Sequence, residues 1–128
     1  MNLNIFSPET LTGLLRPLWA SWRGRDIMNE ALDNLAFSYI SLGQLAEKEK
    51  DVEAAMKYYE KLVELEFEGS YPYDRLAVIY RKAKLPGEEA RVLTRAIHVF
   101  ENVPDERSDK APKLARYRER LRKLEAMP

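Results

Sequence analysis

The sequence predicts an all-α protein. Apolar residues recur every three or four positions along most of the 128 residues, which is the spacing of one helix face. Nothing alternates with a period of two over a useful length, so no strand is expected. Proline, glycine and polar clusters divide the pattern into six helical segments. A chain of this length fits one domain, with about two-thirds of its unfolded surface able to be buried.

The first expected helix lies within residues 1–25, begins at a Ser-Pro-Glu sequence and carries Trp19 and Trp22 on its apolar stripe. Pro17 interrupts that stripe, so a kink or two short helices are expected. Gly24 is expected to end the element. The two tryptophans favour a cap that completes the core, and the alternative is a docking surface, because tryptophan is a frequent interface anchor.

Four helices are expected between residues 26 and 103. They run from Asp26 to Glu49, from Asp51 to Phe67, over residues 71–82, and from Pro86 to the residues before Pro104. Asp51 suits the N-cap of its helix, and Gly69 with Ser70 is expected to stop that helix. A polar linker then leads to a last helix over residues 109–127.

The last helix is amphipathic and basic. Its apolar residues are Leu114, Tyr117, Leu121 and Leu124, and its basic residues include Arg116, Arg118, Arg120, Arg122 and Lys123. This pattern is expected for a cap on the end of the core, and it also allows contact with nucleic-acid phosphates or an anionic surface. Balanced counts of 21 basic and 21 acidic residues argue against a general nucleic-acid binder.

Two of the helices share one internal pattern. The same spacing occurs in two sets of residues: Leu32, Leu35, Ala36 and Tyr39, and then Tyr73, Leu76, Ala77 and Tyr80. This predicts a repeat that matches Leu32 with Tyr73. Each set precedes a helix that has alanine early and larger apolar residues later. In these residues the chain resembles the tetratricopeptide repeat family, whose unit is a pair of helices of about 34 residues.

The resemblance implies a right-handed superhelical stack of two helix pairs, residues 27–69 and 70–103, with an added helix at each end. The helices of each pair are expected to cross at Ala36, Ala77, Ala55 and Ala90. The first copy exceeds the family's spacing by seven residues and the second by one, so lengthened helices are expected in the first. A repeat cannot bury its own face, so the terminal helices, or homodimerisation through one of them, are expected to cover the ends.

No chemistry of a common enzyme is visible in the sequence. Cysteine is absent and His98 is the only histidine, so no usual zinc or iron site can be assembled. The five glycines form no phosphate-binding loop. Neither a secretory signal nor a stretch of about 18 apolar residues is present. We therefore expect a cytoplasmic, non-catalytic protein without a cofactor, a metal or a membrane span.

The resemblance further implies that the first helix of each pair lines a concave groove for a peptide or helix of a partner protein. The residues that match groove positions are Asp33, Phe37, Ile40, Ser41, Asp74, Val78, Arg81 and Lys82. Asp33 and Asp74 stand where some members of the family hold a C-terminal carboxylate with basic side chains, which argues against that specificity. The mixture of apolar and basic residues favours an amphipathic helix, and the expected function is that of an adaptor.

Overall fold

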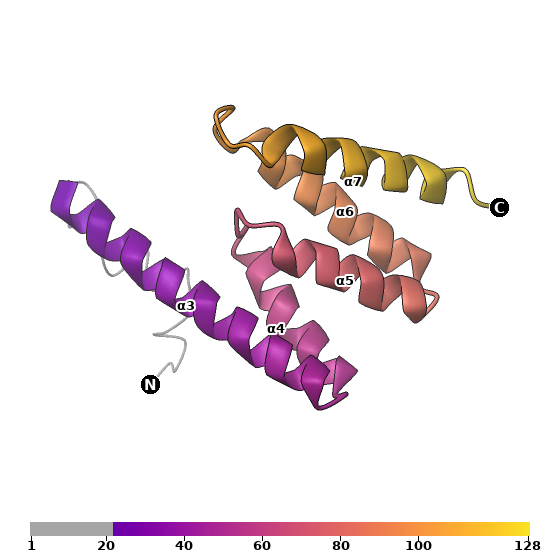
Figure 1. Cartoon of the computed structure of the whole chain (residues 1–128), viewed down its shortest axis with the longest axis horizontal. Coiled ribbons are helices and arrows are strands. Elements are labelled where there is room, and N and C mark those ends of the chain that lie inside the picture. Colours follow the sequence, from indigo (N-terminus) through magenta and orange to yellow (C-terminus); the bar gives the residue numbers. More distant parts are fainter. Residues whose placement is uncertain (1–21) are drawn as a thin grey trace, which may run out of the picture. The chain divides into compact units, whose positions relative to one another are not determined.

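The computed structural model describes residues 22–128, and every element in that part of the chain is an α-helix (Figure 1). The helices are α3 (Trp22–Lys48), α4 (Val52–Glu64), α5 (Tyr71–Lys82), α6 (Pro86–Glu101) and α7 (Lys110–Glu125). The predicted all-α class is therefore confirmed. The predicted kink at Pro17 and the side chain of Trp19 lie outside the described residues. No helix in residues 22–128 has the length and apolar character that a membrane crossing needs.

The chain divides into two compact units after Ser38, and α3 contributes residues to both. The described part of the first unit is helix throughout. Gly24, which was expected to end a helix, lies inside α3 instead. Within this unit Met28 is buried and the side chain of Phe37 is 70% exposed.

In the second unit, Tyr39–Pro128, consecutive helices pack on one another: α4 on α5, α5 on α6, and α6 on α7 (Figure 1). The residues of this unit that are buried most completely are Ala55, Tyr59, Leu62, Tyr73, Leu76, Val92, Ala96 and Phe100. Phe100 of α6 meets Tyr117 of α7 edge to face, with ring centroids 5.7 Å apart. This contact brings the last helix into the same apolar core.

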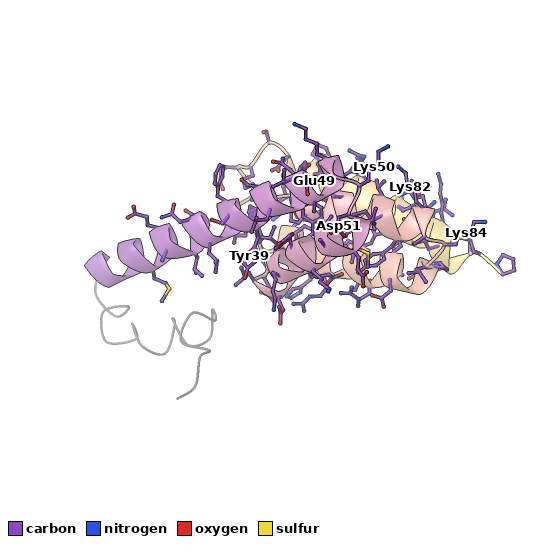
Figure 2. All side chains as sticks on the ribbon, turned by 90° about the horizontal axis from the view of Figure 1, so that it is seen from below. Tyr39, Glu49, Lys50, Asp51, Lys82 and Lys84 are labelled. Atoms are coloured by element: carbon purple, nitrogen blue, oxygen red, sulfur yellow. The ribbon has the colours of Figure 1, made fainter. Side chains whose placement is uncertain are left out.

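The turns after α3 and α5 have the same backbone structure. Lys50 and Lys84 are left-handed, with φ of 63° and 59°. In the first turn the amide of Lys50 donates to the Glu47 carbonyl and that of Asp51 to the Ala46 carbonyl; in the second, Lys84 donates to Arg81 and Leu85 to Tyr80. Each set is a Schellman motif, which satisfies the last carbonyls of a helix. Figure 2 shows Lys50 and Lys84 at the same end of the stacked helices.

The observed register of the repeat therefore matches Lys50 with Lys84, a period of about 34 residues. The predicted register, which matched Leu32 with Tyr73, is wrong. Gly43 marks the crossing of α3 and α4, because a Cβ there would lie 2.4 Å from the Tyr59 ring. The matching residue in α5 is Ala77, which is buried.

In the observed register the turns after α3 and α5 have equal length, so neither predicted insertion lies within a repeat. The seven extra residues predicted for the first copy are helical residues of α3 that precede the repeat.

The register also corrects the predicted crossing residue of α6. Ala55 is fully buried in α4, as expected. Its counterpart in α6 is Glu89, which is 1% exposed, whereas Ala90 is only half-buried. A charged residue therefore occupies a position where the first repeat has the smallest apolar side chain.

The expected polar linker between α6 and α7 is held by two basic side chains. Arg107 donates to the Glu68 carbonyl at 2.6 Å, pairs with Asp109 at 2.8 Å, and lies 5.2 Å from the centroid of the Phe100 ring. Lys110 donates to the carbonyls of Glu101 and Val103 at the end of α6. These contacts fix where α7 begins relative to α6.

Candidate partner-binding groove

A cavity of about 580 Å³ lies between α5 and α7. Its apolar lining comprises Ala77, Val78, Leu93, Ala115 and Tyr117. Its charged lining comprises Asp74, Arg81, Arg116, Glu119, Arg120 and Lys123. We call this cavity the α5–α7 groove. Concave sites with an apolar lining and a few polar groups are the usual form of a binding site.

Asp74 joins the two walls of the groove. Its carboxylate accepts hydrogen bonds from Lys113 Nζ at 2.8 Å and from the Tyr117 hydroxyl at 3.0 Å, both on α7. Burial is the main cause that raises the pKa of Tyr117, and the charge of Asp74 adds to it. The hydroxyl therefore stays protonated and remains a donor. Asp74 was predicted to face a partner, yet its oxygens are already engaged within the chain.

Glu89 lies behind the groove and binds both of its walls. Arg120 of α7 donates to both Glu89 oxygens, at 2.7 and 3.0 Å, and Arg81 of α5 donates to one of them at 3.2 and 3.3 Å. Burial would raise the pKa of the Glu89 carboxyl, but the hydrogen bonds from Arg120 and Arg81 outweigh it and lower the pKa. Glu89 is therefore ionised at neutral pH, and it shares its single negative charge between Arg120 and Arg81.

A similar pair connects α5 to α3. Arg75 Nε donates to Glu47 at 3.0 Å, and the Tyr59 hydroxyl donates to the same carboxylate oxygen at 2.7 Å. The hydrogen bond from Arg75 is the main cause that lowers the pKa of Glu47. Ion pairs thus join α5 to α3 and α5 to α7. The residues that form them are ones that sequence patterns assign to the surface.

The other predicted groove residues lie in different surroundings. Val78 lines the groove, whereas Lys82 is exposed and is not part of its lining. Ile40 is half-buried and Ser41 is exposed, both in the second unit. Asp33 and Phe37 are exposed in the first unit. In the observed register the counterpart of Asp74 is Ile40, so Asp33 lies one heptad upstream of the repeat position it was assigned.

Sequence reasoning missed the contribution of α7 to the groove. Arg116, Arg120 and Lys123 were treated as a separate basic surface, but all three line the cavity opposite α5. Their spacing of four and three residues places them on one face of α7. That spacing, together with Tyr117 between them, was the available signal. The interface role predicted for Trp22 concerns a side chain outside the described part, although its backbone begins α3.

The basic character of α7 is largely neutralised within the chain. The ion pairs of α7 with other elements are Lys110–Asp105, Lys113–Asp74, Arg118–Glu101 and Arg120–Glu89, and within α7 Arg122 and Lys123 both approach Glu119. Within residues 22–128, Arg116 is the α7 cation without an ion pair. This pairing leaves little positive charge for a phosphate backbone, which needs several unpaired cations.

No cluster of three or more potential metal ligands occurs in the part of the chain that the structure describes. His98 is exposed near the end of α6. The arrangement of the groove is suited to non-covalent recognition, with an apolar surface beside fixed charges.

A model of the tetratricopeptide repeat family matches residues 36–68. A search of curated proteins found no match, and a search of solved structures found none either. The matched segment contains Gly43, the left-handed Lys50 and the N-cap Asp51, whose side chain accepts from the Ala54 amide. Its length is close to one period of the observed register. The chain thus contains a tetratricopeptide-like helical repeat at residues 36–68, within a structure that is all-helical over residues 22–128.

Proposed function

We propose that this protein is a non-catalytic interaction module that binds a segment of a partner protein in the α5–α7 groove. The observation that carries the proposal is the cavity itself, which has an apolar lining, cations on α7, and walls joined by partly buried ion pairs. Tetratricopeptide repeats are generally protein-binding units. The absence of cysteine fits the expected cytoplasmic setting.

Preorganisation supports this proposal. Asp74 and Glu89 hold α7 to α5 and α6 through four donors: Lys113, Tyr117, Arg120 and Arg81. The groove therefore keeps its shape before a partner arrives, and little ordering entropy is lost on binding. Val78 and Ala115 present apolar surface from opposite walls, which suits a side chain that anchors a peptide or an amphipathic helix.

Site-specific photo-crosslinking tests this proposal. A photoreactive amino acid replaces Ala115, which lines the groove, and in a control protein it replaces Ala83, an exposed alanine outside it. Tagged protein is irradiated in nuclease-treated lysate of the native host. We expect a discrete protein adduct from position 115 that is absent from position 83.

A pair of apolar-to-acidic substitutions completes the test. Val78→Asp places a charge on the groove lining, whereas Val52→Asp does so at the first residue of α4, where Val52 is 50% exposed. We expect Val78→Asp to abolish the adduct and Val52→Asp to preserve it, with circular dichroism showing that both proteins fold. Equal adducts from positions 115 and 83, or an adduct that survives Val78→Asp, would contradict groove binding.

A further inference from the structure

The charges that line the α5–α7 groove are not equally available to a partner. Arg81 and Arg120 both bind the buried Glu89 carboxylate. Arg116 lines the groove with no ion pair to any described residue, and Lys123 has only Glu119, at 3.9 Å. Glu119 is itself bound by Arg122 through two hydrogen bonds, at 2.8 and 3.0 Å. Lys123 is therefore a weakly engaged cation, with a side chain that is 60% exposed.

The acids of the groove do not offset these cations. Asp74 is neutralised by Lys113, Glu119 by Arg122, and Glu89 by two arginines. One positive charge remains on the cluster of Arg81, Arg120 and Glu89, and the two lining cations without a close acid are Arg116 and Lys123. These two residues stand seven positions apart on one face of α7, a rise of about 10 Å. Of the apolar lining, Tyr117 lies between them in α7, and Val78 belongs to α5 on the other wall.

Resting on the proposed function, we infer that the groove selects an acidic segment with two carboxylates that flank a large apolar residue. The carboxylates meet Arg116 and Lys123, and the apolar side chain between them lies against Val78 and Tyr117. A separation of about 10 Å corresponds to acids seven residues apart on a helix or three residues apart in an extended segment. Complementary charges at the edge of an apolar site give specificity and fast association.

Peptide display against the purified full-length chain tests this inference. A library of random 16-residue peptides is selected at 150 mM salt, and enriched peptides are measured by fluorescence anisotropy. We expect enriched sequences to carry aspartate or glutamate at the predicted separation around a large apolar residue. Enrichment of neutral or basic sequences would overturn the inference.

Matched double variants show which cations of the groove bind the acidic side chains of the peptide. Arg116→Gln with Lys123→Gln removes two charges that line the groove, and Arg118→Gln with Lys57→Gln removes two from exposed residues outside the lining. We expect the first pair to weaken peptide binding about tenfold, as two rim ion pairs of moderate strength would. The second pair should change binding less than about twofold. Equal weakening by both pairs would show non-specific charge attraction and overturn the inference.

The outcomes distinguish this inference from the proposed function. Peptides that lose binding with Val78→Asp but not with Arg116→Gln and Lys123→Gln would leave the groove as a binding site and refute its acidic selectivity. Peptides that are insensitive to all three substitutions would refute both. A single-stranded DNA 20-mer is the competing probe; if it binds more tightly than the best peptide at 150 mM salt, the assigned partner class is wrong.

Discussion

The surroundings of Glu89 differ from those of Ala55, its counterpart in the first repeat. Ala55 is buried there without polar partners, whereas Glu89 is buried with two arginines. A buried carboxylate is costly without compensation, and each arginine supplies charge and hydrogen bonds. Glu89 consequently connects α5, α6 and α7 at one point.

Acid should weaken the fold through Glu47 and Glu89. Both folded-state pKa values lie below the ordinary 4.5, so their stabilisation is fully present above that pH and is lost as pH falls through the folded-state values. We expect the urea-unfolding free energy to decrease below about pH 4.5. In Glu89→Gln the decrease between pH 5.5 and pH 3.5 should be smaller, whereas Glu53→Gln, which alters an exposed residue, should behave as the parent does. An unchanged acid dependence in Glu89→Gln would contradict this account.

The left-handed turn residues offer a second prediction at this scale. Lys84 has a φ of 59° and an exposed side chain. A left-handed conformation costs a non-glycine residue about 1–2 kcal/mol, and glycine avoids that cost but loses more entropy on folding. We expect Lys84→Gly to raise the unfolding free energy by about 0.5 kcal/mol. Lys57→Gly, inside α4, should lower it by about 1 kcal/mol, and chemical denaturation of both variants provides the measurement.

At the scale of elements, α3 and α4 approach closely because Gly43 has no side chain. The Tyr59 ring that faces it is fully buried, and its hydroxyl is held by Glu47. The ring therefore cannot move aside for a Cβ placed 2.4 Å away. The two helices therefore pack through a glycine, although glycine is unfavourable for helix formation.

Two glycine-to-alanine substitutions test this packing. We expect Gly43→Ala to lower the unfolding free energy by about 1–3 kcal/mol through overpacking, despite the better helix propensity of alanine. Gly87→Ala in α6, where nothing lies within 4 Å of the added Cβ, should raise it by about 0.5 kcal/mol. Thermal and urea unfolding of both proteins measure the difference. A stabilising Gly43→Ala would show that α3 and α4 cross elsewhere.

The elements of the two repeats also differ in what covers them. Leu76 and Ile79 of α5 are buried, at 0% and 7% exposure. Their counterparts in α3, Leu42 and Leu45, are 41% and 50% exposed. Helix α4 of the first pair packs on α5 of the second pair. Among the described residues, no helix precedes α3 to pack on it in the same way.

At the scale of the whole molecule, α7 is held in place by polar contacts as well as by apolar packing. Leu114, Tyr117 and Leu124 are buried along it, and Arg120 connects it to Glu89. We expect Arg120→Ala to lower the unfolding free energy by about 2 kcal/mol, because a buried carboxylate loses its bidentate partner. The effect should be concentrated in α7.

Hydrogen exchange of the α7 amides measures that effect. The matched control is Arg122→Ala, because Arg122 is 66% exposed and pairs only within α7. Its removal should change stability by less than about 0.5 kcal/mol. Equal protection of α7 in the two variants would show that Glu89 does not hold this helix.

The sequence predicted every described helix, because three- and four-residue periodicity and strong end signals such as Asp51 and Pro86 act locally. It misplaced the repeat register, and the reason is geometric. The predicted period and the observed one differ by seven residues, close to two turns of helix, so both keep the apolar face of the helix in phase. Spacing within one helix therefore could not separate Ala36 from Gly43 as the crossing residue.

The candidate site was predicted only on its α5 wall. Val78, Asp74 and Arg81 were identified through the repeat, but the role of α7 depends on where the linker places it, and Arg107 and Lys110 determine that through contacts with distant carbonyls. Sequence patterns also could not show that Asp74 and Arg81 are paired inside the chain, because their partners lie 39 and 8 residues away.

The sequence by itself determined the helical class, the helix-pair unit and the lack of common catalytic constellations, since these follow from residue types and local spacing. Only the tertiary structure decided which small residue lies at the helix crossing, that Glu89 is buried and paired, and which cations of α7 remain unpaired beside an apolar groove. Those features depend on contacts between distant segments, where close packing and the cost of burying a charge select one arrangement from several with the same periodicity.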